Sequence, residues 1–82
     1  MEETQGNVME LEIKLFASLR KFNPELERIE VDDGITILEL FDKAGIPPSE
    51  VAIVLVNGRH AKLDQPLHDG ETVAAFPPIA GG

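Results

Sequence analysis

Residues 35–48, with the sequence ITILELFDKAGIPP, predict the helix around which the fold is organised. Thr36 and, three residues later, Glu39 have the spacing of a capping box, in which each side chain accepts a hydrogen bond from the other residue's backbone N–H. Gly45 is a helix stop, and the IPP that follows cannot continue a helix. Apolar residues at helical spacing form one stripe between these signals: Ile37, Leu40, Phe41 and Ala44. We therefore predict one amphipathic helix that ends at Gly45.

Segments on both sides of this helix have the patterns of β-strands. MELEIKLF at 9–16 alternates apolar and polar residues, which is typical of a strand with one buried face, and ERIEV at 27–31 reads as a shorter strand. VAIVLV at 51–56 is apolar at both odd and even positions, which favours a strand covered on both faces. The Asn-Gly pair after it is a hairpin signal, so we expect a short return strand at about 59–63. TVAAF at 72–76 is the last strand, because the proline pair after it cannot donate to a ladder.

The order of these segments predicts an α+β fold, with a mixed sheet of four to five strands and one main helix packed across one face. The first and last strands should lie side by side and parallel, because the helix supplies the crossover that a parallel return needs. We expect a mobile N-terminal extension at 1–8, a folded domain at 9–76 and an extended tail at 77–82.

Composition limits the classes of function. The chain has 82 residues, a formal net charge of -8 and no cysteine. An acidic surface repels phosphate backbones and anionic lipids, so we expect neither nucleic acid nor membrane as a partner, and a basic groove on another protein fits better. The lack of cysteine removes disulfides, thiolate metal sites and thiol nucleophiles. It also favours a cytoplasmic location, and from the acidic, polar residues at the N-terminus we expect no signal peptide.

Residues that could carry catalysis are isolated. His60 and His68 have no carboxylate or second histidine at ligand spacing, and the sequence has neither a GxSxG motif nor a glycine-rich loop after a strand. We therefore expect no enzyme active site, no metal site and no bound cofactor in this chain.

The end of the sequence, VAAFPPIAGG, is the strongest functional signal. Pro77-Pro78 favours a stiff, extended spacer. Gly81-Gly82 has no Cβ atoms, so it can enter a slot too narrow for other residues. Taken alone, such an end is more often a frayed terminus or a remnant of cloning than a functional group.

The strand-strand-helix-strand order together with this Gly-Gly end resembles the ubiquitin-like β-grasp fold. Within that fold, VNGRHAKLDQPLHDGETVAAFPPIAGG at 56–82 is similar to the end of molybdopterin synthase small subunits, where Pro-Pro-x-x-Gly-Gly is typical. The resemblance extends from about Met9 to Gly82 and includes KLFASLR at 14–20. The related sulfur carriers of thiamine synthesis usually end in Gly-Gly without the two prolines.

The resemblance implies a chemical role for the carboxylate of Gly82. A ubiquitin-activating-type adenylyltransferase would adenylate it with ATP, and sulfur from a sulfur donor protein would displace AMP to give a thiocarboxylate. The sulfur would then pass to a pterin precursor in the large subunit of molybdopterin synthase, so this chain would be a non-catalytic subunit. The residues that would thread into these partners are Pro77, Pro78, Ile79, Ala80 and Gly81.

Two aromatic residues predict a partner-binding face. Phe16 has the parity of the polar residues of the first strand, and Phe76 has the parity opposite to the inward Val73 and Ala75. Both rings should therefore lie on the uncovered face beside the tail, although strand ends that curl under would bury them. In the family the matching positions contact partner proteins. A third family contact is usually apolar but falls on His60 here.

Two alternatives use the same tail: a protein modifier joined through Gly82 to lysines, and a sulfur carrier for thiamine synthesis or tRNA thiolation. A third alternative, an inert ubiquitin-like docking domain, would not require Gly82 to be free. The sequence does not separate a molybdenum pathway from a tungsten pathway.

Overall fold

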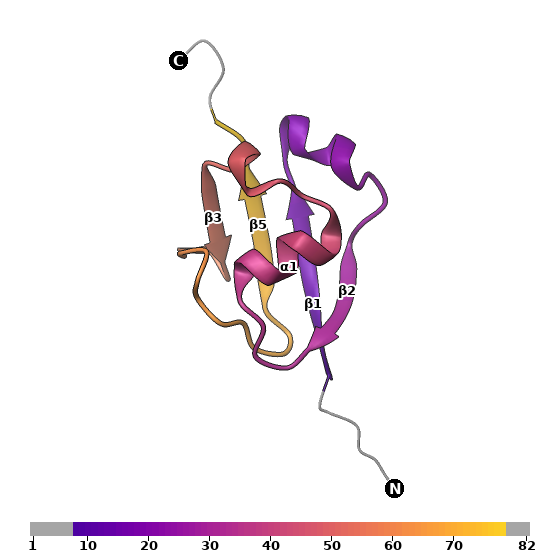
Figure 1. Ribbon diagram of the computed structural model, residues 1–82, viewed down its shortest axis with the longest axis vertical. Coiled ribbons are helices and arrows are strands. Elements are labelled where there is room, and N and C mark those ends of the chain that lie inside the picture. Colours follow the sequence, from indigo (N-terminus) through magenta and orange to yellow (C-terminus); the bar gives the residue numbers. More distant parts are fainter. Residues whose placement is uncertain (1–7, 79–82) are drawn as a thin grey trace, which may run out of the picture.

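The first strand lies inside the sheet and has a partner on each side. In the computed structural model, which describes residues 8–78, β1 (Val8–Leu15) is paired with β2 (Arg28–Asp32), antiparallel, and with β5 (Thr72–Phe76), parallel. β3 (Ile53–Val56) lies antiparallel to β5, and β4 (Arg59–His60) forms the edge beyond it. The sheet has the order β2-β1-β5-β3-β4 (Figure 1). This confirms the predicted mixed sheet and its parallel first and last strands.

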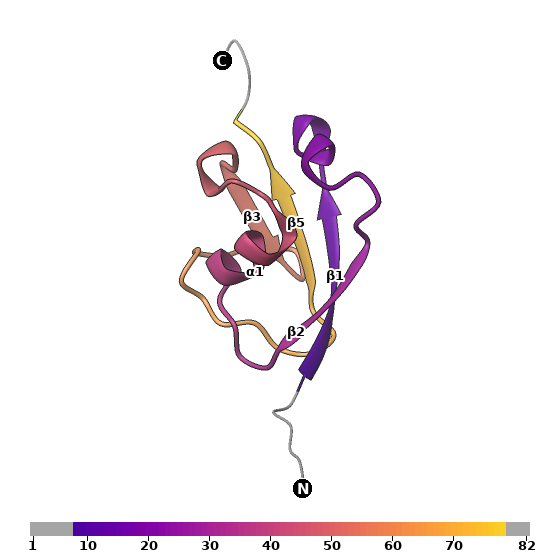
Figure 2. The ribbon, with the colours of Figure 1, turned by 45° about the vertical axis from the view of Figure 1, so that its right-hand side comes forward.

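The predicted helix is α1 (Ile37–Ala44), which lies across one face of the sheet (Figures 1 and 2). Both hydrogen bonds of the capping box are present: the Glu39 N–H donates to Thr36 Oγ1 at 3.2 Å, and the Thr36 N–H donates to Glu39 Oε1 at 2.8 Å. Gly45 ends the helix with φ of 78°, a left-handed conformation that glycine adopts without steric cost. The four stripe residues are buried, so the helix and the inner face of the sheet share one core: Ile37, Leu40, Phe41 and Ala44.

The segment 61–67 leaves the sheet and closes the start of α1. The N–H groups of Ile37 and Leu38 donate to the carbonyl oxygens of Gln65 and Leu63, at 3.1 and 2.9 Å. A helix start has no internal acceptors for these donors, so the segment supplies them. The return strand is consequently shorter than the predicted 59–63: β4 covers only Arg59–His60.

The prediction that the strand at 51–56 is covered on both faces was wrong. β3 starts at Ile53, after the short 3-10 helix η2 (Pro48–Glu50). Val54 and Val56 are buried, whereas Ile53 is 41% exposed and Leu55 is partly exposed. Among residues 8–78, α1 covers one face of the sheet and no second layer covers the other. The apolar residues of β3 on that second face therefore remain at the surface.

The N-terminal limit of the domain differs by one residue from the prediction, whereas β5 ends at the predicted residue 76. Val8, assigned to the extension at 1–8, belongs to β1 because its backbone pairs with Asp32. The rest of that extension lies outside the described residues. Because β1 and β5 are parallel, they end at the same end of the sheet (Figure 1), where the 3-10 helix η1 (Ala17–Phe22) follows β1 and Pro77 follows β5.

We expect the capping box of α1 to contribute measurably to the free energy of unfolding. Thr36→Ala should lower the free energy of unfolding by about 1 kcal/mol, because it leaves the Glu39 N–H without its acceptor. The chain has neither tryptophan nor tyrosine, so urea unfolding is followed by far-ultraviolet circular dichroism. Thr36→Ser keeps the hydroxyl and should retain most of the stability. Equal stability of Thr36→Ala and wild type would show that the cap contributes nothing.

Candidate functional site

Two aromatic rings lie together on the uncovered face, at the end where β5 stops. The rings of Phe16 and Phe76 are stacked, with centroids 4.4 Å apart and planes 7° from parallel. Phe16 is 40% exposed, and Phe76 is partly buried. The structure therefore places both rings on the outer face, as predicted, and neither is in the buried core.

Two residues of β3 extend this surface, and sequence reasoning missed them. Ile53 pairs with Phe76, and Leu55 pairs with Ala74. Residues directly opposite each other on neighbouring strands point to the same face, so all of these side chains share the outer face. The signal was present, because VAIVLV is apolar at both parities and a single helix covers only one of them. We call this surface the outer apolar patch: Phe16, Ile53, Leu55, Ala74 and Phe76.

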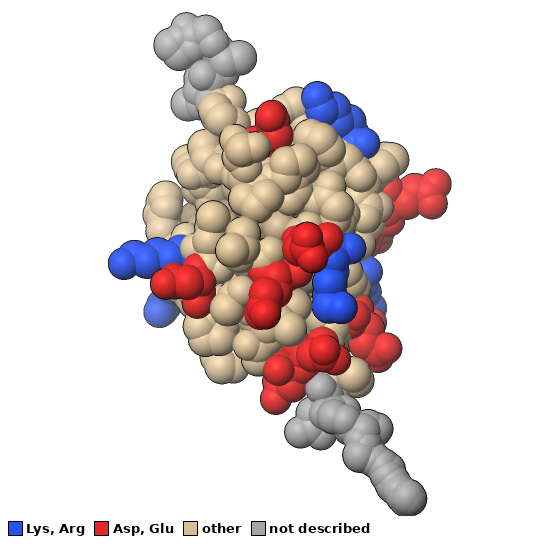
Figure 3. All heavy atoms as spheres, viewed as in Figure 1, with Lys and Arg blue, Asp and Glu red and all other residues tan. Residues whose placement is uncertain are grey.

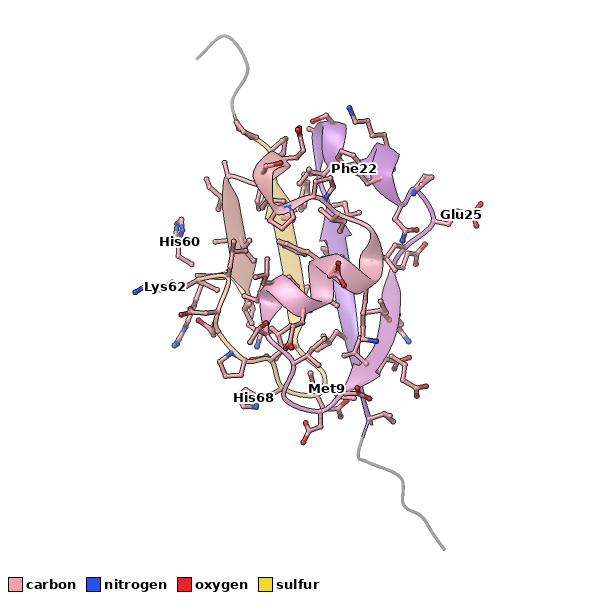
Figure 4. All side chains as sticks on the ribbon, in the orientation of Figure 1. Met9, Phe22, Glu25, His60, Lys62 and His68 are labelled. Atoms are coloured by element: carbon pink, nitrogen blue, oxygen red, sulfur yellow. The ribbon has the colours of Figure 1, made fainter. Side chains whose placement is uncertain are left out.

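His60 lies at the border of the outer apolar patch. It pairs with Leu55 from β4, is exposed, and projects from the sheet edge (Figure 4). Lys14 pairs with Ala74 on the opposite side of the patch. The patch is therefore bordered by a histidine and a lysine, and His60 remains part of the predicted partner face.

The rest of the described chain offers no second chemical centre. His68 lies at the other end of the molecule from the tail, away from His60 (Figure 4). Residues 8–78 contain no group of three or more histidine, cysteine or acidic side chains that could hold a metal ion. In the same residues, no helix combines the length and apolar character needed to cross a membrane.

Charge separates the two ends of the outer face. Away from the patch, Glu10 pairs with Glu30 and Glu12 pairs with Arg28, while Thr72 Oγ1 donates to Glu12 Oε1 at 3.0 Å. On the helix-covered face, most of the visible acidic side chains lie over the middle and lower part (Figure 3). The end from which the tail leaves is thus the more apolar end, and the acidic charge is concentrated away from it.

The tail begins where β5 loses its partners. The Phe76 carbonyl oxygen accepts a hydrogen bond from the Ala52 N–H at 2.8 Å, and Pro77, half-buried, has no N–H with which to continue the ladder. Pro77 and Pro78 leave the sheet beside the outer apolar patch. The remaining predicted tail residues lie outside the described residues, so their roles stay predictions: Ile79, Ala80, Gly81 and Gly82.

Ile53 and Val54 are adjacent in β3 and point to opposite faces of the sheet, so charged substitutions at these two positions test which face is open to solvent. Ile53→Asp should keep the stability within about 1 kcal/mol of wild type, because this side chain is already exposed. Val54→Asp should cost at least about 4 kcal/mol, since it buries a charge without a partner. Urea unfolding of both variants measures the difference. If Ile53→Asp unfolds the protein as Val54→Asp does, the outer face is not open.

Solved structures of several proteins have this architecture. The Haloferax volcanii HVO 2177 protein is 28% identical with a TM-score of 0.73, and the alignment covers 100% of this chain and 94% of that one. SAMP1 from Haloferax volcanii is 28% identical with a TM-score of 0.66, covering 89% of this chain and 99% of its own. A putative molybdopterin converting factor, subunit 1, from Pyrococcus furiosus has a TM-score of 0.64 at 23% identity, covering 87% and 99%. At that identity the last likeness shows the fold alone.

A comparison with curated protein sequences found no match. The model of the ThiS family matches residues 13–82, which include the last three residues of β1, every later element and the tail. With the five-stranded mixed sheet and its single main helix, this match confirms the predicted β-grasp fold. The chain therefore belongs to the ThiS family, a family of ubiquitin-like sulfur carriers.

Proposed function

We propose that this protein carries sulfur as a thiocarboxylate on Gly82 and donates it in molybdopterin synthesis, as the small subunit of molybdopterin synthase. One observation supports this most directly: the outer apolar patch lies beside the point where Pro77 and Pro78 leave the sheet. A partner that binds the patch has the tail within reach. The Pro-Pro-x-x-Gly-Gly sequence favours the molybdopterin pathway over thiamine synthesis.

The proposed chemistry needs a free carboxylate on Gly82. A carboxylate is ionised at neutral pH and is a poor electrophile, so it requires activation. A ubiquitin-activating-type adenylyltransferase supplies this: the carboxylate attacks the α-phosphorus of ATP, and pyrophosphate leaves. The terminal persulfide sulfur of a donor protein then attacks the acyl carbon, and AMP leaves with its electron pair. A second thiol attacks the donor sulfur of the resulting acyl disulfide, so the S–S bond breaks, the two thiol sulfurs join as a disulfide, and the carried sulfur stays on the acyl group with the electron pair. The thiocarboxylate that results carries the sulfur to the active site of the large subunit.

In this scheme the protein is a co-substrate rather than an enzyme. It supplies the acyl group and a binding surface, while ATP and the pterin precursor are bound by its partners. We propose three protein partners: the adenylyltransferase, the sulfur donor and the large subunit. The reactions would take place in the cytoplasm, where ATP is available.

A second function has its own support. SAMP1 from Haloferax volcanii is 28% identical to this chain, and a second solved structure from the same organism is described as small archaeal modifier protein 1. A modifier would use the same activated Gly82 but transfer it to a lysine amine of another protein. The products differ: a carrier gains one sulfur atom, whereas a modifier forms a covalent adduct with a second chain.

Activation of Gly82 is tested by intact mass. Incubation with ATP, a matching activating enzyme and a sulfur donor should replace one carboxylate oxygen with sulfur, a gain of about 16 Da. Deleting Gly82 should abolish the gain without changing the unfolding curve, because a residue beyond the two prolines contributes little to the core.

A chain extended by one residue after Gly82 is the matched control. Its new end lies about 3.5 Å beyond the original one. A misplacement of that size can slow a reaction by orders of magnitude, so the mass gain should again be absent. Full conversion of the extended chain would contradict the proposed role of Gly82.

Binding to the large subunit should depend on the outer apolar patch. Ile53→Asp should weaken the affinity at least about tenfold in titration calorimetry, because it places a charge in the centre of an apolar contact. Val8→Asp is the control: Val8 is 58% exposed but lies on β1 at the end remote from the tail, so its variant should bind as wild type does. Equal loss in both variants would contradict a role specific to the patch.

A further inference from the structure

The last two residues of β5, Ala75 and Phe76, are each held by a hydrogen bond, from opposite sides, just before the tail begins. From this we infer that Phe16 is a positioning residue, which fixes the direction in which the tail leaves the sheet. The inference rests on the proposed function, since it concerns delivery of Gly82 to an activating site. It assigns to the ring of Phe16 a role separate from contact with a partner.

The backbone of β5 is restrained up to its final residue. The Phe16 N–H donates to the Ala75 carbonyl oxygen at 3.1 Å from the β1 side. The Ala52 N–H donates to the Phe76 carbonyl oxygen at 2.8 Å from the β3 side. Beyond these bonds, a residue that precedes proline is confined to extended conformations, and the proline ring fixes φ. The initial direction of the tail therefore follows from the orientation of Phe76.

Phe16 is itself a fixed platform. Its N–H is used by β5, and its carbonyl oxygen accepts a hydrogen bond from the Leu19 N–H at 3.1 Å. Leu19 is fully buried, so it anchors η1 in the core. Ala17 has φ of 54°, a left-handed conformation that turns the chain away directly after Phe16. A residue without glycine's freedom adopts this conformation only where its surroundings impose it.

The stacked rings connect this platform to the tail. With centroids 4.4 Å apart and planes 7° from parallel, the ring of Phe16 restrains the ring of Phe76 next to Pro77. Among residues 8–78, this is the one aromatic pair in contact. A leucine at position 16 would preserve apolar area for a partner but would lose the flat face on which Phe76 rests.

Two roles for Phe16 can be separated by kinetics. If its ring only contacts the partner, truncation changes binding and therefore KM. If it positions the tail, truncation leaves binding largely intact and lowers kcat, because the reacting carboxylate is presented in fewer productive orientations. Phe16→Leu and Phe16→Tyr form the informative pair, since tyrosine keeps the planar ring and leucine does not.

The first measurement does not require a partner. Hydrogen exchange of the Ala52 amide reports the bond to the Phe76 carbonyl oxygen. Phe16→Leu should accelerate this exchange about three- to tenfold, which corresponds to the loss of one aromatic pair. Phe16→Tyr should leave it unchanged.

Phe22→Leu is the matched control, because the ring of Phe22 lies in η1 with the Lys21 ammonium 5.2 Å from its centroid and is not stacked on Phe76. The Ile13 amide, bonded to the Glu27 carbonyl oxygen at 2.8 Å, corrects for any change in global stability.

The second measurement is steady-state formation of the thiocarboxylate with a matching activating enzyme, ATP and a sulfur donor. Phe16→Leu should lower kcat about tenfold with KM within about twofold of wild type, and Phe16→Tyr should restore kcat. A change confined to KM, or tyrosine no better than leucine, overturns the positioning role. If the wild-type chain is not activated at all, the proposed function fails and the exchange of Ala52 decides the positioning role by itself. If the wild type is activated and Phe16→Leu matches it in both kcat and exchange, only the positioning role fails.

Discussion

The parallel pairing of β1 with β5 is the constraint from which the rest of the fold follows. Parallel neighbours cannot be joined by a tight turn, so the chain must cross from one end of the sheet to the other, and α1 makes that crossing. The same pairing sets Leu15 opposite Ala75 and so brings the residues that follow them, Phe16 and Phe76, to one end of the sheet. The stacked rings, the outer apolar patch and the origin of the tail are all consequences of this one alignment.

The single helix then divides the sheet into two unlike faces. On the inner face, α1 and the segment 61–67 complete the core, and that segment also supplies acceptors for the first N–H groups of the helix. The outer face has no such cover within residues 8–78. Apart from Val8, its exposed apolar side chains are grouped at the tail end and its paired charged residues lie at the other, as expected for a surface on which one end meets a partner and the other remains in water.

Local signals made most of the fold predictable. The capping box and Gly45 fixed the limits of α1, and Asn57-Gly58 gave the hairpin turn, in which both residues have positive φ, of 52° and 83°. Parity alone placed Phe16 and Phe76. Features that depend on distant contacts were not predictable. The apolar pattern of β3 does not show whether one or both faces of the strand will be covered. β4 is short because the segment after it supplies carbonyl acceptors to the first N–H groups of α1, a contact that the local sequence does not reveal. Of the site, the structure shows the outer apolar patch, while the role of Gly82 stays a prediction from the sequence.

The two prolines after Phe76 separate the folded domain from covalent changes at the end of the chain. Because Pro77 has no N–H to donate to a neighbouring strand and β5 ends before it, we expect covalent changes further along the tail to leave the sheet undisturbed. For a carrier of the kind proposed, the loaded and empty forms then present the same folded surface and have the same stability. A partner that distinguishes the loaded form from the empty form must therefore contact the carboxylate or thiocarboxylate of Gly82 itself. The surface of the folded domain that partners recognise is therefore the same in both forms, and the two forms differ only at the last residues of the chain.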